Sequence, residues 1–248
     1  MTTCTQPNDG CTRSMKGRTM RLVRTIIPVL LLACLLGCKV ESQHEVFISE
    51  LRDVAFGDQA GGAIETRFRT TVGNSKNCEK HRPNVIAIIA RYHGNVSAGE
   101  CRQEGGWTDL TFTAATPLVQ NPDAPLPGNA VFALAARPGE KAGTVSLFIV
   151  LDKGRLTQLQ NELRGLDSWQ ESISFEPVTV TLNNDTGGSV RLRTVSAFLN
   201  REPELVVDVD VARRSRAELR LSDVTIALIR KAGKSFVSVL ELRPPQGG

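Results

Sequence analysis

Cysteine is the residue type in this chain best suited to covalent chemistry. Six cysteines occur, and two of them, Cys34 and Cys38, lie within or directly after an apolar run over residues 25–37. A cysteine thiolate is a nucleophile, so it can take an acyl group or bond to a second cysteine. Cys78 and Cys101 lie well beyond the run, in the body of the chain. The sequence therefore indicates two separate kinds of cysteine chemistry.

The apolar run is typical of an export signal. It holds about a dozen residues, whereas a transmembrane helix needs about 20. Basic residues precede it, namely Lys16, Arg18, Arg21 and Arg24. A basic start, a short apolar middle and small residues at the end are the three parts of a secretory signal. We expect residues 1–37 to be removed on export, with Met20 as the true start and residues 1–19 upstream of it.

The end of the run carries a more specific pattern. Four residues there resemble the lipobox of bacterial lipoproteins: Leu35, Leu36, Gly37 and Cys38. In such proteins the cysteine is acylated, for example with palmitate, and becomes the first residue of the mature chain. The resemblance implies a membrane anchor at Cys38, because two or more acyl chains hold a protein stably on a bilayer. Residues 31–34 are a second, less complete candidate. Lys39 stands where an Asp commonly retains lipoproteins in the inner membrane, so an outer-membrane lipoprotein facing the periplasm is expected.

Removal of the signal changes the charge balance. The whole chain has 30 basic and 26 acidic residues and a net charge of +4. Residues 1–37 hold five of the basic residues and one acid, so 25 of each sign remain. The mature chain is then close to neutral, and no basic footprint for nucleic acid is left.

The two cysteines of the chain body are predicted to form a disulfide. Cys78 and Cys101 would be the last free pair in an oxidising compartment. Closing a loop of this size is worth roughly 3 to 4 kcal/mol in the chain-entropy model. A metal or redox pair is the alternative, but the C-x-x-C spacing is absent.

Hydrophobic periodicity predicts the elements that position these residues. A period of two indicates strands at 63–72, 107–119, 130–136, 144–151, 178–182, 190–199, 205–211 and 236–242. A period of 3.6, with capping residues, indicates helices at 44–55, 83–93, 153–165 and 222–231. A strand stays open as an alternative at 83–93, where β-branched residues are frequent. The turn 183–188 is expected to join two strands as a hairpin.

These elements predict an α+β fold, mainly antiparallel sheet with about three to four short helices packed on it. Residues 38–43 are expected to be a tether and 44–120 an N-terminal α/β subdomain that contains the disulfide. The proline-rich stretch 121–129 is a natural boundary or long loop. A β-rich C-terminal subdomain is then expected over 127–248.

Catalytic motifs are absent from the sequence. No G-x-S-x-G or H-E-x-x-H pattern occurs, and the phosphate-loop pattern fails because Leu228 stands five residues before Gly233. Of the three histidines, His44 lies in or beside the predicted tether, and His81 and His93, which flank the helix predicted at 83–93, are interpreted as surface residues. Oxygen-bearing side chains at 183–188 could bind calcium, but a turn explains them better. We therefore predict no catalytic residue, no cofactor and no metal site.

Longer segments carry a family resemblance. They are LDKGRLTQLQNELR (151–164), VTVTLNNDTGGSVRL (178–192) and ARRSRAELRLSDV (212–224). Together with the lipid site they resemble uncharacterised lipoproteins of temperate bacteriophages and prophages of Gram-negative bacteria, a domain of unknown function covering most of the mature chain. The resemblance implies no catalytic residue. The expected function is a non-enzymatic, lipid-anchored envelope protein that binds another envelope component and hinders superinfection. The alternative is an accessory lipoprotein of a secretion or conjugation assembly.

Overall fold

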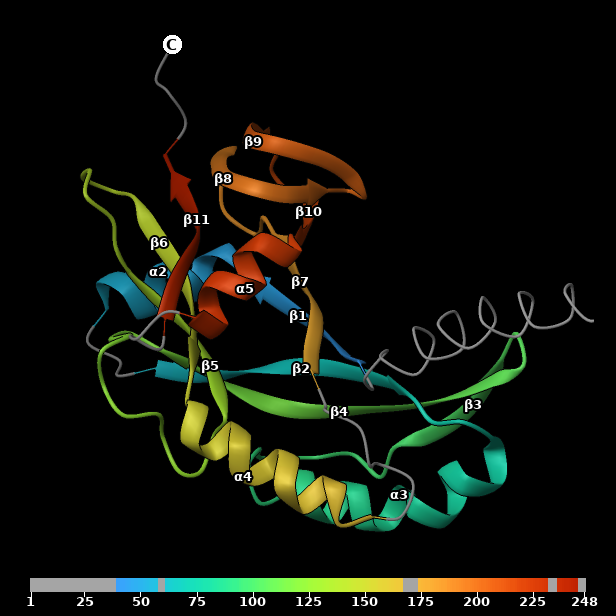
Figure 1. Ribbon diagram of the computed structural model, residues 1–248. Coiled ribbons are helices and arrows are strands. Elements are labelled where there is room, and N and C mark those ends of the chain that lie inside the picture. The colour runs from blue at the N-terminus through green and yellow to red at the C-terminus, as the bar shows by residue number, and fades with distance from the viewer. Residues whose placement is uncertain (1–38, 58–60, 167–173, 232–235, 245–248) are drawn as a thin grey trace, which may run out of the picture. The chain divides into compact units, whose positions relative to one another are not determined.

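Strands dominate the computed structural model, which describes residues 39–57, 61–166, 174–231 and 236–244. These described residues form one compact unit. Its strands, shown in Figure 1, are β1 (Lys39–Phe47), β2 (Gly61–Thr71), β3 (Glu100–Glu104), β4 (Trp107–Val119), β5 (Phe132–Pro138), β6 (Val145–Leu151), β7 (Ser174–Asn183), β8 (Val190–Leu199), β9 (Glu202–Val211), β10 (Arg216–Leu221) and β11 (Phe236–Arg243). The helices of the described residues are α2 (Ile48–Phe56), α3 (Ser75–Ile89), α4 (Lys153–Arg164) and α5 (Asp223–Lys231).

Nine of the strands close into a β-barrel. Neighbours follow the order β10-β7-β1-β2-β4-β5-β6-β11-β8, and β8 returns to β10 through the pair Leu219–Leu199. Most neighbours are antiparallel, whereas β1–β7 and β4–β5 are parallel. Closure leaves no free edge within the ring, because each of its strands has a partner on both sides.

The closed barrel corrects the predicted α+β class. The sequence interpretation took the strands as mainly antiparallel sheet with short helices packed on it. Alternation reveals where strands lie but not which strands pair, and the ring depends on pairs between distant segments such as β1 with β7. Residues 44–120 and 127–248, predicted as two subdomains, both supply strands to this one ring.

Two further strands and one loop lie outside the ring. β3 pairs with β4, and β9 pairs with β8. The proline-rich loop packs Leu126 and Ala130 against Phe148 and Val150 of β6. Strand β5 is therefore buried on both faces from Phe132 to Ala136, which explains why its sequence is almost wholly apolar.

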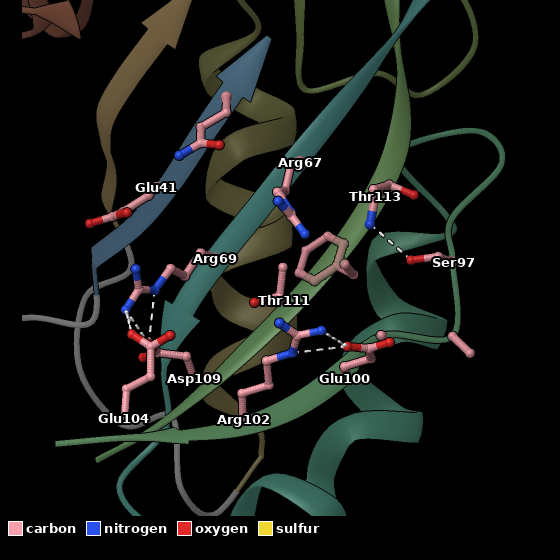
Figure 2. Close-up of a pocket in the computed structure, with 14 residues that line it drawn as sticks. Glu41, Arg67, Arg69, Ser97, Glu100, Arg102, Glu104, Asp109, Thr111 and Thr113 are labelled. Carbon is pink, nitrogen blue, oxygen red and sulfur yellow. Dashed lines mark hydrogen bonds and ion pairs between the residues drawn. The ribbon is translucent and has the colours of Figure 1, made fainter. Parts of the chain in front are cut away.

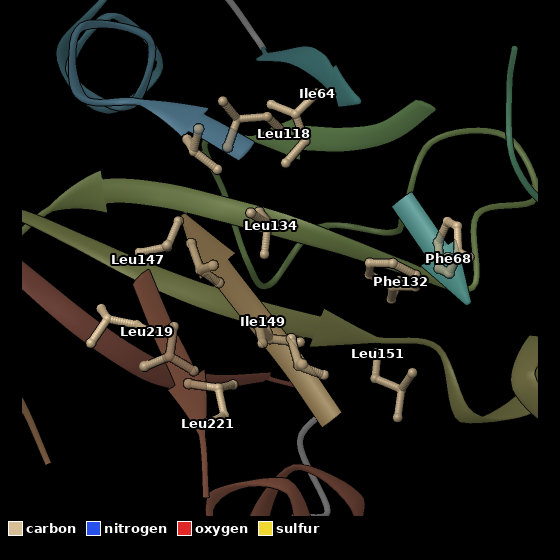
Figure 3. Packing of buried hydrophobic residues seen from close by; sticks show 14 of the residues in the cluster. Ile64, Phe68, Leu118, Phe132, Leu134, Leu147, Ile149, Leu151, Leu219 and Leu221 are labelled. Atoms are coloured by element: carbon tan, nitrogen blue, oxygen red, sulfur yellow. The ribbon is translucent and has the colours of Figure 1, made fainter. Parts of the chain in front are cut away.

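The barrel is filled by the inward-facing residues of its strands. Figure 3 shows side chains from β2, β4, β5, β6 and β10 meeting there, among them Phe68, Phe132, Leu134 and Leu147. Leu134 and Leu147 are fully buried. Burying a leucine side chain completely contributes about 2 kcal/mol, so this interior is the main source of stability.

The helices cover the barrel and its flanking strand. α2 packs on β5, β6 and β1, α3 packs on β3 and β4, and α5 packs on β11 and β7. α4 lies against α3. Tyr92, three residues after the end of α3, donates a hydrogen bond from its Oη to Glu162 Oε1 of α4 over 3.0 Å. No helix among the described residues is long and apolar enough to cross a membrane.

Two local predictions need correction. Most of the predicted tether, residues 39–43, lies in β1, which pairs with β2 and β7. The helix predicted from His44 begins at Ile48.

The predicted hairpin between β7 and β8 is also wrong. Both edges of β7 are occupied, by β1 and by β10, so the turn at 183–188 joins strands that are not paired with each other.

Asn184 organises that turn. Its side chain is buried, donates to the carbonyls of Gly188 and Val211 over 2.9 and 2.8 Å, and accepts from the backbone N–H of Thr186. The next residue, Asp185, accepts hydrogen bonds from the backbone and hydroxyl of Ser49. Asp185 therefore caps the start of α2 from 136 positions away in the chain.

Candidate functional site

A polar groove of about 500 Å³ crosses the outer face of β1, β2, β4 and β3 (Figure 2). Strand alternation creates it, since Phe68 and Thr66 of β2 point into the barrel while Arg67 and Arg69 point outward. The strand register aligns the outward residues in two rows: Glu41, Arg69, Thr111 and Glu100 in one, and Gln43, Arg67 and Thr113 in the other. Side chains directly opposite on neighbouring strands are close enough to interact.

One end of the groove is held by an ion-pair network around Arg69. Its Nε donates to Asp109 Oδ2 over 2.8 Å, and its Nη2 lies 2.6 Å from Glu104 Oε2. Thr71 Oγ1 donates to the other oxygen of Asp109 over 2.8 Å. Asp109 is almost fully buried, and its hydrogen bond with Arg69 raises the pKa of that guanidinium. The side chain of Arg69 is therefore held in place, and its positive charge is neutralised by carboxylates of the chain.

The environment of Arg67, at the middle of the groove, differs from that of Arg69. Its side chain is exposed between Gln43 and Thr113, and it makes no ion pair among the described residues. An exposed guanidinium beside amide and hydroxyl groups matches carboxylate or phosphate groups, to which arginine can donate two parallel hydrogen bonds. The arrangement suits binding of a negatively charged group.

The far rim is built by β3 and the segment before it. The disulfide between Cys78 and Cys101 joins β3 to α3, with a Cα–Cα distance of 6.0 Å, as predicted. Ser97 binds the edge of β4 twice, donating from its N–H to the carbonyl of Thr113 and accepting from Thr113 N–H at its Oγ over 2.8 Å. Gly99 has a φ of +73°, and a Cβ there would lie 3.2 Å from Leu110 Cδ1. The rim therefore tolerates little change at Gly99.

The groove residues favour binding over catalysis. Across the described ranges, no group of three or more His, Cys, Asp or Glu side chains is placed to hold a metal ion. The hydroxyls of Ser97 and Thr113 lie on the groove, and no histidine lines it. Charge-assisted hydrogen bonds from Arg67 are thus the chemistry this surface offers.

The three histidines are buried, whereas the sequence suggested surface positions for His81 and His93. His44, His81 and His93 are 1%, 6% and 6% exposed. His44 Nδ1 lies 2.9 Å from Thr66 Oγ1, and Thr66 Oγ1 donates to Thr116 Oγ1 over 2.7 Å. These polar residues form a buried row across three strands.

His93 has a different environment from His44. Both rings pack near Phe132, at centroid distances of 5.4 Å for His44 and 5.2 Å for His93. Neither ring nitrogen of His93 has a hydrogen-bond partner among the described residues. Burial lowers the pKa of His44 to about 3, with the neighbouring charge of His93 as a second cause. Burial also lowers the pKa of His93 to about 4, although the backbone at Ala115 opposes this shift. Both imidazoles are therefore neutral.

The predicted site residues are placed as follows. Cys78 and Cys101 are joined, whereas Cys38 and the lipobox residues 35–37 lie outside the described residues. The sequence interpretation missed the groove. Its signal was present in the alternation of Glu65, Arg67 and Arg69 along β2, but the facing residues of β1 and β4 are known only from the register.

Comparison with known proteins gives a family but no characterised relative. A family model described as a domain of unknown function (DUF7424) matches residues 41–243. The match runs from Glu41, the third residue of β1, to Arg243, the last residue of β11, and so covers the barrel. No curated protein matches the chain, and no solved structure matches it.

Proposed function

Since the chain belongs to the DUF7424 family, whose description names no activity, we propose a function from the residues of the chain itself. The protein is a lipid-anchored, non-enzymatic component of the bacterial envelope. It is held at Cys38 on the periplasmic side of the outer membrane, and it binds another envelope component through the polar groove. A prophage or phage origin, and a role in excluding related phages, belong to the same proposal.

Arg67 is the observation that supports binding at the groove. Its neighbours on the same face, Arg69 and Arg102, are neutralised by carboxylates of the chain, since Arg102 Nη2 lies 2.9 Å from Glu100 Oε2. Arg67 has the same exposed setting without such a partner among the described residues. A partner that presents a carboxylate or phosphate at this point would supply the missing counter-charge.

The lipid anchor is supported by the sequence before the barrel. A cysteine after Leu35-Leu36-Gly37, preceded by a basic and then an apolar segment, stands one residue before β1 begins. Acylation there would hold the protein at the membrane surface. The groove would then lie close to the envelope component that we propose as its partner.

Charge reversal at the groove tests the binding proposal. The tagged wild-type chain, Arg67→Glu and Arg213→Glu are each captured from membranes, and the co-purifying components are compared. Arg213 is a matched control, because it is exposed and lies outside the groove. We expect a component that wild type and Arg213→Glu retain and that Arg67→Glu loses. Equal recovery by all three chains would contradict the groove as the binding surface.

The exclusion role needs a separate test. Host cells that express the chain from a plasmid are challenged with related phages and scored for adsorption and killing. We expect reduced killing with the wild type and restored killing with Arg67→Glu. If cells expressing the wild type are killed as readily as control cells, the exclusion role is wrong even where the groove binds a partner.

A further inference from the structure

We propose that the tip of the β3–β4 hairpin faces the membrane and that Trp107 lies in its headgroup layer. This orientation rests on the proposed lipidation of Cys38. It adds to the proposed function a second contact with the lipid surface and a defined distance between that surface and the groove.

The strand register brings the hairpin tip to the anchored end of β1. Val40 of β1 pairs with Thr70 of β2, and Thr70 pairs with Leu110 of β4. Two residues further, Val72 N–H donates to the carbonyl of Thr108. Since neighbouring strands are about 4.8 Å apart, the start of β1 and the Trp107 end of β4 lie roughly 10 Å apart across the sheet.

The chain leaves no spacer between the anchor and the barrel. β1 begins at Lys39, directly after Cys38, and one extended residue spans at most about 3.6 Å. A lipid on Cys38 would therefore hold this end of the barrel against the membrane. A flexible tether over residues 38–43 would have allowed free tumbling, but residues 40–44 are paired with β2.

The tip itself has the chemistry of a membrane interface. Trp107 is 63% exposed and pairs with Glu104 across the turn Gly105-Gly106. Both glycines have positive φ, +54° and +94°, as tight hairpin turns require. Tryptophan prefers the headgroup region, because its ring is apolar and its indole N–H needs a polar partner.

The charges near the tip are compatible with a lipid surface. α3 begins at Ser75, four residues after β2 ends, so its first turn lies at the same end, and Lys76 is exposed there. Glu104 is paired with Arg69, and Glu79 is paired with Arg82. The acidic groups of this end are thus partly neutralised, while Lys76 can approach anionic headgroups.

The orientation places the groove close to the bilayer. Glu104 and Asp109 line the groove and also lie beside Trp107. Arg67 of β2 is five residues before Val72, which directly follows the strand, and this distance is about 16 Å at 3.3 Å per residue. A partner bound at Arg67 would then contact the protein within about 20 Å of the headgroups, as a membrane component or a partner lying flat on the membrane could.

Tryptophan quenching by brominated lipid tests the orientation. The chain has two tryptophans, Trp107 and Trp169, so Trp169→Phe leaves Trp107 as the sole reporter. The full chain is expressed in a Gram-negative host, purified with its lipid, and reconstituted into phosphatidylcholine–phosphatidylglycerol vesicles with bromines near the headgroups. We expect loss of about half of the Trp107 emission, because an interfacial indole lies within reach of shallow bromines.

A reporter at the other end of β1 is the matched control. Phe47 is 41% exposed and eight residues from Lys39, about 26 Å along the strand. Phe47→Trp in a Trp107→Phe, Trp169→Phe background should keep its emission in the same vesicles. Equal emission of Trp107 in brominated and plain vesicles, or equal quenching of both reporters, overturns the orientation.

Palmitate labelling separates the two possible failures. A labelled chain whose Trp107 is not quenched retains the proposed anchor and rejects the orientation. A chain that takes up no label at Cys38 rejects the anchor, and the orientation that rests on it is rejected with it.

Discussion

Acid should destabilise this protein strongly through two buried imidazoles, those of His44 and His93. Their pKa values are about 3 and about 4 in the folded chain, against an ordinary value of 6.5. Because both are lowered, the unfolded chain binds more protons between pH 6.5 and about 4. The free energy of unfolding is therefore fully retained above pH 6.5 and falls as the pH drops through this window.

The size of the loss follows from the two shifts. At pH 4.5 an ordinary histidine of the unfolded chain is two pH units below its pKa, and each unit is worth about 1.36 kcal/mol. Each buried histidine then costs roughly 2 to 3 kcal/mol between pH 7.5 and pH 4.5, and the pair roughly 5 kcal/mol. That is a large part of the 5 to 15 kcal/mol typical of a whole domain.

Substitution His93→Phe isolates one of the two contributions. The His93 ring packs beside Phe68 at 5.6 Å and Phe132 at 5.2 Å, so a phenyl ring enters an aromatic environment and leaves no nitrogen unpaired. Its packing cost is the same at both pH values. We expect the difference in unfolding free energy between pH 7.5 and pH 4.5 to shrink by about 2 to 3 kcal/mol.

Urea unfolding followed by circular dichroism at both pH values measures this difference. Phe112→Leu is the control, since Phe112 stacks on Phe68 at 5.1 Å and carries no proton. It should lower stability equally at pH 7.5 and pH 4.5. A His93→Phe chain with the same pH dependence as wild type would refute the account of a buried, neutral His93.

Further substitutions test the contacts that support the barrel and groove. Asp185→Ala should cost about 1 to 2 kcal/mol in urea unfolding, because it removes the cap of α2, and Asp185→Asn should recover part of it. Cys78→Ser with Cys101→Ser should cost about 3 kcal/mol through a loop of 23 residues, and reductant should have no effect on that double variant. Arg69→Met should cost about 1 to 3 kcal/mol, since it leaves the buried Asp109 carboxylate without its main donor; an unchanged midpoint would show that solvent replaces Arg69.

The sequence predicted local structure better than long-range pairing. The strand at Trp107–Val119 and the helix from Lys153 matched closely, because alternation and an Asp152 cap are local signals. β1 was taken as tether and helix, although Val40, Ser42, His44 and Val46 all point inward. Two polar residues in that row hid the alternation, and their burial depends on partners from β2 and β4 that a single strand cannot reveal.

The groove could be predicted only in part for the same reason. Alternating Arg67 and Arg69 marked one polar face of β2, but Glu41 and Thr111 join it through register. His81 and His93 were placed on the surface because they belong to no catalytic or metal-binding motif and are twelve residues apart. His44 packs against Phe132, and His93 against Phe68 and Phe132; these contacts join distant segments of the chain, which no local pattern encodes.

Labelling of the intact protein with radioactive palmitate tests the central claim most directly, since both the envelope function and the membrane-facing hairpin depend on the anchor. The wild-type chain is expected to incorporate label, and Cys38→Ala is expected to lose it and to stay unprocessed. Cys34→Ala should label like the wild type. Label that persists in Cys38→Ala, or a wild-type chain that takes up none, would contradict a lipid anchor at Cys38.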